Sequence, residues 1–144
     1  MAIDVVGKVL VSATVENLED LFAERDGRLE RDSVRRSEVT DALVDTGATM
    51  LSMPGKLIRE LGLKQYRSRT ARTANGMATF NIYSPVRLTI QERDCVLEVA
   101  ELPDDCPTLI GQIPLEMLDF VVDTPGHRLI GNPEHGGEQM IEVF

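Results

Sequence analysis

The chain has 144 residues, of which 42% are apolar and 27% charged, a composition that indicates a globular domain and excludes a disordered tail. This length suffices for one domain with its own hydrophobic core, without disulfides or a structural metal. The net charge of −9 would repel phosphate backbones and anionic membrane surfaces, so neither nucleic acid nor a membrane is an expected partner.

The N-terminal residues and the cysteines indicate a cellular compartment. Asp4 and Lys8 interrupt the stretch where a secretory signal needs an unbroken apolar run, and no apolar run approaches membrane-spanning length. We therefore expect a cytoplasmic protein. Cys95 and Cys106 are too few for a disulfide framework and lack metal-ligand spacing, so two reduced, packed thiols are expected.

The first predicted element is a strand over Lys8–Val15, where apolar and β-branched residues alternate with polar ones. Eight acidic and five basic residues follow between Glu16 and Glu38. This density predicts a charged surface insertion with at most one short helical turn. The insertion could be a solvated loop or an arm that binds a partner, and the sequence leaves both interpretations open.

A buried strand is predicted at Ala42–Val44, and it ends abruptly at Asp45-Thr46-Gly47. After this turn, Pro54 occupies a first-turn position, and the apolar residues of Lys56–Leu61 recur at helical spacing. These signals predict a short packing helix, which Gly62 terminates.

Two hairpins and one further short strand are predicted next. Tyr66–Ala74 and Met77–Tyr83 flank Asn75-Gly76, the dipeptide that best tolerates the positive φ angles of a two-residue turn. Arg67, Arg69 and Arg72 alternate with small polar residues there, as on the solvated face of a strand. The second hairpin pairs Val86–Ile90 with Cys95–Leu102, and Thr108–Gly111 forms a short apolar strand.

The C-terminal third is predicted to hold a helix, a hairpin and a tail. Pro114 opens a helix that runs to Leu118, and Phe120–Val122 pairs with Arg128–Ile130 around a Thr-Pro-Gly turn. Asn132–Gln139 contains two adjacent glycines and is expected to be flexible. Many short strands with two short helices indicate a mainly β domain that is closed or nearly so.

Three ordered motifs lie between Val39 and Leu118. Leu43-Val44 precedes Asp45-Thr46-Gly47-Ala48, the hairpin tip Thr73–Met77 contains Asn75-Gly76, and Leu109-Ile110-Gly111 precedes a helix. This arrangement resembles the retropepsin family of aspartic peptidases. The resemblance implies a small, closed, β-barrel-like acid-protease fold, mainly β, with one or two short helices. We expect a single domain over 1–144, with the charged insertion at 16–38 and a C-terminal tail at 132–144.

The resemblance also implies an activity and an assembly. Peptide hydrolysis without a covalent intermediate needs one group that takes a proton from water and another that protonates the carbonyl oxygen, and two close carboxylates can divide this work. This sequence has one Asp-Thr-Gly segment, so the family's chemistry would require a homodimer in which Asp45 pairs with its symmetry mate. The expected activity is that of an endopeptidase on extended or unfolded polypeptide, with no cofactor and no metal.

By the same resemblance, further residues take three roles. They are support of the active-site loop by Thr46, Gly47 and Ala48, a flap formed by Asn75, Gly76 and Met77, and substrate binding by Thr49, Ile82, Ile110 and Gly111. Thr49 and Met50 stand where many retroviral members carry acidic residues that grip the substrate backbone. Viral dimers interleave their termini in a shared sheet, for which Met140–Phe144 and Arg128–Ile130 are both candidates.

Two alternatives belong to other functional classes. A retropepsin-like domain can serve as a dimerisation or peptide-binding module with little turnover, because fold alone does not guarantee activity. An Asp before Gly can also simply cap a turn in a structural β domain. Other catalytic signals are weak: His127 and His135 lack ligand spacing, and Ser52 and Ser84 lack a nucleophile-elbow motif.

Overall fold

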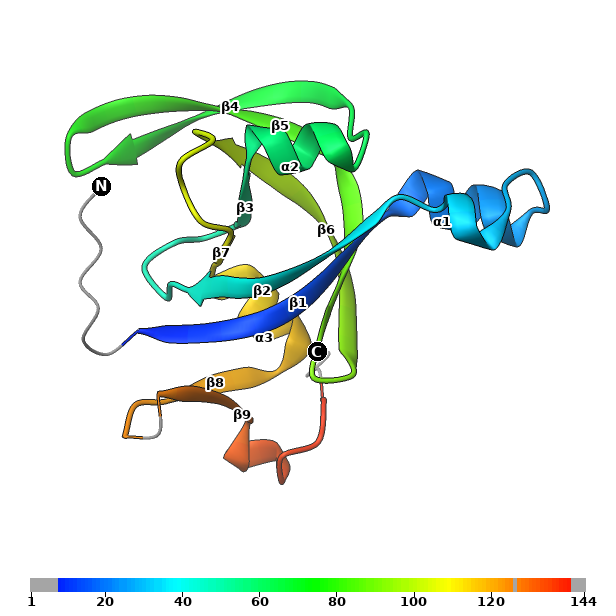
Figure 1. Cartoon of the computed structure of the whole chain (residues 1–144). Helices are drawn as coiled ribbons and strands as arrows, with labels where there is room; N and C mark the ends of the chain where they lie inside the picture. The colour runs from blue at the N-terminus through cyan, green and yellow to red at the C-terminus, as the bar shows by residue number, and fades with distance from the viewer. Residues whose placement is uncertain (1–7, 126, 141–144) are drawn as a thin grey trace.

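The computed structural model describes residues 8–125 and 127–140 (Figure 1). Nine strands dominate this part of the chain, which confirms the predicted mainly β class. They are β1 (Val9–Asn17), β2 (Arg36–Val44), β3 (Leu51–Pro54), β4 (Gln65–Thr73), β5 (Gly76–Ile90), β6 (Arg93–Leu102), β7 (Leu109–Ile110), β8 (Phe120–Asp123) and β9 (Arg128–Gly131). The helices are α1 (Leu18–Arg25), α2 (Gly55–Glu60) and α3 (Gln112–Leu118), with short 3-10 turns η1 (Arg31–Ser33) and η2 (Pro133–His135).

Seven of the strands form one sheet that closes on itself. Their order is β1-β2-β7-β3-β6-β5-β4, and an additional antiparallel pairing of β1 with β5 joins the first strand to the sixth. Six strands therefore make a ring, which satisfies edges that would otherwise be open. Only β4 lies outside the ring, as the outer strand of the long β4–β5 hairpin (Figure 1).

The core fills this ring. Alternate residues of β5 point inward, so Val86, Leu88 and Ile90 are buried while their neighbours are partly exposed. Helices α2 and α3 lie at the upper and lower ends of the ring in Figure 1. They add the buried side chains of Leu57, Ile58, Leu115 and Leu118, and Leu61, directly after α2, is buried as well.

Strand β3 was not predicted from the sequence. Its four residues are all buried, pairing in parallel with β6 and antiparallel with β7. A segment buried on both faces shows no polar alternation, and Leu51–Pro54 is too short to be distinguished from the turn before it. Only the pairing with two distant strands makes it a strand.

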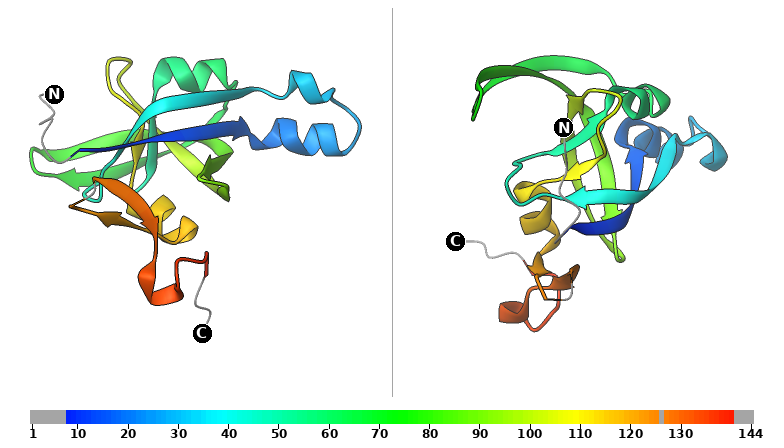
Figure 2. Two further views of the ribbon diagram at one scale, coloured as in Figure 1. Left: turned by 60° about the horizontal axis from the view of Figure 1, so that its bottom comes forward. Right: turned by 60° about the vertical axis from the view of Figure 1, so that its left-hand side comes forward.

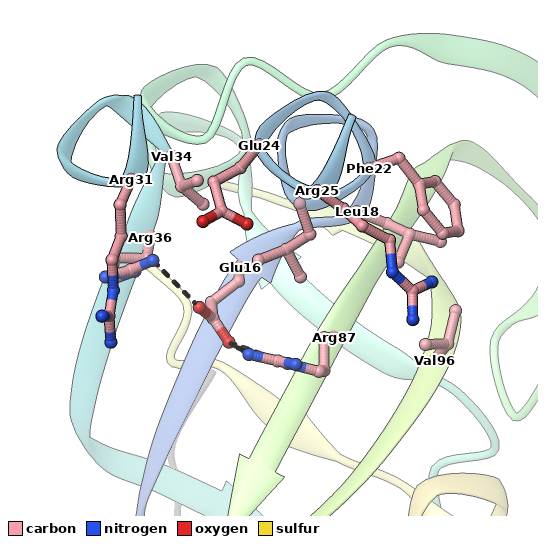
Figure 3. Close-up of a pocket in the computed structure, with 11 residues that line it drawn as sticks. Glu16, Leu18, Phe22, Glu24, Arg25, Arg31, Val34, Arg36, Arg87 and Val96 are labelled. Carbon is pink, nitrogen blue, oxygen red and sulfur yellow. Dashed lines mark hydrogen bonds and ion pairs between the residues drawn. The ribbon is translucent and has the colours of Figure 1, made fainter. Parts of the chain in front are cut away.

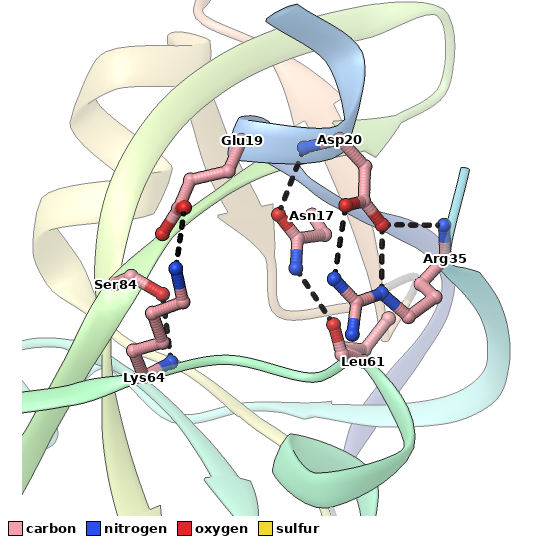
Figure 4. Close-up of polar contacts among 7 residues, drawn as sticks. All are labelled: Asn17, Glu19, Asp20, Arg35, Leu61, Lys64 and Ser84. Carbon is pink, nitrogen blue, oxygen red and sulfur yellow. Dashed lines mark hydrogen bonds and ion pairs between the residues drawn. The ribbon is translucent and has the colours of Figure 1, made fainter. Parts of the chain in front are cut away.

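The charged insertion is shorter and more ordered than predicted. Glu16 and Asn17 belong to β1 and are buried, and residues 36–38 belong to β2, so the excursion from the sheet spans residues 18–35. It contains the two-turn helix α1, which Asn17 caps by accepting a hydrogen bond from Asp20 N at 3.1 Å. The same Asn17 donates to Leu61 O at 2.8 Å, which ties the helix to the chain after α2 (Figure 4).

The first predicted hairpin is present with its turn displaced by one residue. Thr73 pairs with Gly76, so the two turn residues are Ala74 and Asn75 in place of Asn75-Gly76. The positive φ of 109° falls on Gly76 alone. The Thr73 hydroxyl accepts from Asn75 N and donates to Gly76 O, and this side-chain bonding accounts for the displaced register.

The C-terminal segment Asn132–Gln139, which was predicted to be flexible, contains the 3-10 turn η2 and is held to Asp119 by hydrogen bonds. The buried carboxylate of Asp119 accepts from Asn132 Nδ2 at 3.2 Å and from Met140 N at 3.0 Å, and it lies 2.6 Å from His135 Nδ1. The hydrogen bond with His135 is the main cause that lowers the pKa of Asp119. The predicted β8–β9 hairpin precedes this segment, and residues 141–144 lie outside the described part of the chain.

Within the described ranges, no helix has the length and apolar character needed to cross a membrane. Cys95 is buried and Cys106 is half-buried, and both are free cysteines.

Candidate active site

Asp45 lies at the point where β2 leaves the sheet. β2 runs parallel to β7, with Leu43 opposite Leu109 and Val44 opposite Ile110. Asp45 N continues this ladder by donating to Ile110 O at 3.0 Å, after which the chain turns through Thr46-Gly47. The apolar strand thus fixes the position of the carboxyl group at the rim of the ring.

The turn orients the Asp45 carboxylate. Gly47 N donates to Asp45 Oδ1 at 3.0 Å, and Ala48 N donates to Asp45 O at 3.0 Å. Asp45 and Ala48 are half-buried, whereas Thr46 and Gly47 are exposed in the single chain. The Thr46 hydroxyl makes no hydrogen bond with the described residues, so the turn presents a free polar group outward.

The loop after Asp45 is clamped onto the start of α3. Gln112 N donates to Ala48 O at 2.8 Å, Ile113 N donates to Thr49 O at 3.0 Å, and Gly111 N donates to Met50 O at 3.1 Å. The first N–H groups of a helix have no acceptor within the helix, and here the carbonyl oxygens of the loop accept their hydrogen bonds. Motifs about 60 residues apart in the sequence thereby form one rigid unit. Sequence reasoning had identified Gly111 but not Gln112 or Ile113.

The β4–β5 hairpin arches over the same side of the molecule as the Asp45 loop, as all three ribbon views show (Figures 1 and 2). Its tip residues Asn75, Gly76 and Met77 are exposed, and every residue of β4 is exposed as well. A hairpin with so little packing of its own can move relative to the ring.

The comparison with known families decides what this arrangement is. Residues 36–116, more than half of the chain, match the family described as gag-polyprotein putative aspartyl protease. The chain belongs to this family. The matched range contains the Asp45 loop, the hairpin tip and the start of α3, and the family is a retropepsin-like aspartyl protease domain, as the resemblance implied. No curated protein matches the chain.

In this aspartyl-protease-family domain, a hollow of about 590 Å³ adjoins the Asp45 loop. Thr49, Met50 and Ile113 line one side of it, and Arg67 and Arg69 of β4 line another. Thr49, which was expected to bind substrate, is exposed and lines this hollow. Met50 and Ile113 are additional candidates that the sequence did not single out.

An ion pair shapes the outer wall of this hollow. Arg67 Nη2 bonds to both carboxylate oxygens of Glu98 on β6. Partial burial alone would raise the pKa of Glu98, but hydrogen bonds from Tyr66 and Arg67 outweigh it and hold that pKa below its usual range. Arg69 makes no ion pair among the described residues. The hollow therefore presents a cation beside an apolar floor.

Two of the residues expected to contact substrate are buried. Ile82 and Ile110 have exposed fractions of 0%; Ile82 of β5 pairs with Ala100 of β6, and Ile110 of β7 lies between β2 and β3. Neither lines the hollow beside Thr49 and Met50. Ile110 supports the site indirectly, since its carbonyl oxygen accepts from Asp45 N.

Other chemistry finds little support among the described residues. No group of three or more His, Cys, Asp or Glu side chains could hold a metal ion there. Burial raises the pKa of the Cys95 thiol to about 12, so it is protonated and a poor nucleophile at neutral pH. Asp45 combines an orientation set by the hydrogen bond from Gly47 N with a half-buried position next to the exposed Thr46 and Gly47.

Proposed function

We propose that the chain is an aspartic endopeptidase that is active as a homodimer, with a water molecule activated between Asp45 and Asp45 of a second copy. The observation that carries this proposal is the geometry of the Asp45 loop in an aspartyl-protease-family domain. Gly47 N orients the carboxylate, and the loop that follows Asp45 is hydrogen-bonded to the start of α3. The β4–β5 hairpin lies on the same side of the molecule.

The assembly follows from the number of catalytic segments. The sequence contains one Asp-Thr-Gly, and the chemistry needs two carboxylates, so a second copy has to supply the other. The exposed Thr46 and Gly47 support this arrangement, because they can meet the same residues of a partner across a two-fold axis. The free Thr46 hydroxyl would donate or accept a hydrogen bond across that axis.

Two adjacent carboxylates can perform both halves of the reaction. At close range the two carboxylates cannot both be ionised, so they share one proton. Aspartic peptidases are the standard example of this effect. The ionised member would take a proton from water as it attacks the peptide carbonyl. The protonated member would donate its proton to the carbonyl oxygen. A later proton transfer from the dyad to the amide nitrogen would let the C–N bond break and release the amine.

The substrate is proposed to be extended or unfolded polypeptide. An extended segment could lie between the Asp45 loop and the hairpin, where the exposed β4–β5 tip would close over it and exclude water. The hollow beside Thr49 and Met50 would accept a side chain beyond the scissile bond.

The direct test is proteolysis of an unfolded protein from acidic to neutral pH by the wild-type chain and by Asp45→Asn. We expect Asp45→Asn to lose activity by about 1,000-fold or more, because the general acid–base pair is gone. A pepstatin-type transition-state mimic should inhibit the wild type. Asp41→Asn is the matched control, since Asp41 is an exposed carboxylate on β2, the strand that leads to Asp45, and its replacement should leave activity unchanged.

The outcomes separate the proposal from its rival. Cleavage that persists in Asp45→Asn would refute the mechanism. A stable dimer that binds the unfolded protein but cleaves it at no pH would instead identify a peptide-binding or dimerisation module.

A further inference from the structure

A row of paired residues crosses four strands beneath α1. Arg36 of β2 lies opposite Glu16 of β1, Glu16 lies opposite Arg87 of β5, and Arg87 lies opposite Val96 of β6. This row forms the floor of a groove of about 610 Å³, and α1 forms its wall (Figure 3). We call it the α1 groove.

The centre of the floor is a buried carboxylate between two guanidinium groups. Glu16 is 6% exposed, and its Oε1 accepts from Arg87 Nε at 2.9 Å and Nη2 at 2.7 Å. Its Oε2 lies 3.3 Å from Arg36 Nη2. One carboxylate thus fixes two arginines whose side chains remain 44% and 41% exposed. Both can offer further N–H donors to a ligand.

The groove carries more positive charge than its own acids neutralise. Arg25 and Arg31 also line it, and neither makes an ion pair with any described residue. With Glu24 as the remaining acid, four arginines face two glutamates, a local net charge of +2 in a chain whose overall net charge is −9. Such a local reversal of sign selects anionic groups.

The groove is also apolar. Phe22 of α1 is 49% exposed and Val96 of β6 is 42% exposed, and both lie on the right-hand side of the groove in Figure 3. Leu18, Leu21 and Val34 complete the apolar lining. An inorganic anion would use the arginines and leave this surface in water, whereas a peptide with acidic and apolar side chains would cover both.

The wall of the groove is held in place. Asp20 of α1 accepts three hydrogen bonds from Arg35, from N at 2.9 Å, Nε at 2.8 Å and Nη2 at 2.9 Å (Figure 4). Glu19 pairs with Lys64 at 3.0 Å on the other side of the helix. A groove that is already formed loses little conformational entropy when it binds a ligand.

The α1 groove does not contain Asp45, and the one lining residue it shares with the hollow beside the Asp45 loop is Val96. Arg36 begins β2 and Asp45 follows its last residue, a separation of nine residues or about 30 Å along an extended strand. A ligand in the groove would therefore leave Asp45 open.

We propose that the α1 groove docks an acidic segment of a partner polypeptide, in which glutamate or aspartate residues alternate with apolar side chains. The acidic groups bind Arg25, Arg31, Arg36 and Arg87, and the apolar groups pack on Phe22 and Val96. The proposal goes beyond the peptidase activity and does not depend on it.

Fluorescence anisotropy tests the proposal with a short fluorescein-labelled peptide that alternates glutamate with leucine. The full-length chain carries Asp45→Asn, so that the probe stays intact. We expect saturable binding that weakens by about tenfold in the double variant Arg25→Glu/Arg31→Glu, because two exposed attractive charges become repulsive. Phe22→Ser, or replacement of the peptide's leucines by serine, should also weaken binding.

The matched control is Arg69→Glu/Arg72→Glu, which changes the net charge equally at two exposed arginines of β4. This control should bind as the parent does. Equal loss in both double variants would overturn the proposal, because binding would then reflect overall charge or the hollow near β4. Equal binding of a glutamine–leucine peptide, or tighter binding of a single-stranded oligonucleotide, would overturn it as well.

Discussion

At Gly111, a methyl group would lie 2.5 Å from the carbonyl oxygen of Met50 and 2.8 Å from that of Ala48. The φ angle of −85° is one that any residue adopts, so glycine is needed here for space and not for backbone conformation. The neighbouring atoms are backbone atoms of the loop that follows Asp45, and they cannot rotate away. The close approach therefore couples the position of Asp45 to the start of α3.

Gly111→Ala should lower the free energy of unfolding by about 1–3 kcal/mol, because the loop has to shift to relieve the overlap. Peptidase activity should fall with it, since Asp45 moves with the loop. Urea unfolding and a proteolysis assay measure the two effects. Gly27→Ala is the control: its φ is +77° in open space, so it should cost about 1 kcal/mol and spare activity. Unchanged stability of Gly111→Ala would contradict this account.

At the scale of elements, α1 depends on polar contacts more than on the core. Asp20 is its one buried residue, and the helix is attached through Asp20–Arg35 and through Asn17. The hydrogen bond from Arg35 lowers the pKa of Asp20, against the opposing effect of desolvation. The folded value therefore lies below the unfolded value of about 4. This stabilisation is complete above pH 4 and is lost as the pH falls through the lowered folded value.

Asp20→Asn should reduce the free energy of unfolding by about 2 kcal/mol at pH 7, because hydrogen bonds from a charged donor to an ionised acceptor are lost. The difference from wild type should shrink at pH 2.5. Urea unfolding at both pH values measures it. Asp26→Asn removes an exposed pair with Arg28 and should change stability by less than about 0.5 kcal/mol. A deficit for Asp20→Asn that is equal at both pH values would show that charge is not its cause.

At the scale of the whole molecule, the closed ring leaves two parts without partners in the single chain. The turn at Thr46-Gly47 is exposed, and within the described residues β8 and β9 pair only with each other. Both parts are available to a second copy, and β9 contains the Arg128–Ile130 candidate for a shared sheet. The other candidate, Met140–Phe144, falls almost entirely outside the described residues.

Specific activity should rise with protein concentration through the range in which the dimer forms, because the monomer holds one catalytic carboxylate. Thr46→Val should shift this range to about tenfold higher concentration, since a symmetric interface loses the hydroxyl twice. Sedimentation and activity measured together on a dilution series test this prediction. Thr40→Val, an exposed change on β2, should leave the range unchanged. A monomer with full activity would refute the dimer.

Sequence patterns predicted the strand that ends at Asp45, the β4–β5 hairpin without the exact position of its turn, the helices α2 and α3, and the family. Each of these rests on local chemistry: alternation of apolar side chains, turn residues and short motifs. Tertiary structure alone decided that Leu51–Pro54 is a strand, that Ile82 is core, that Asp119 anchors the C-terminal segment, and that Glu16 joins Arg36 to Arg87. These features depend on which distant backbones pair and which charges become buried, and neither is encoded in the spacing of neighbouring residues.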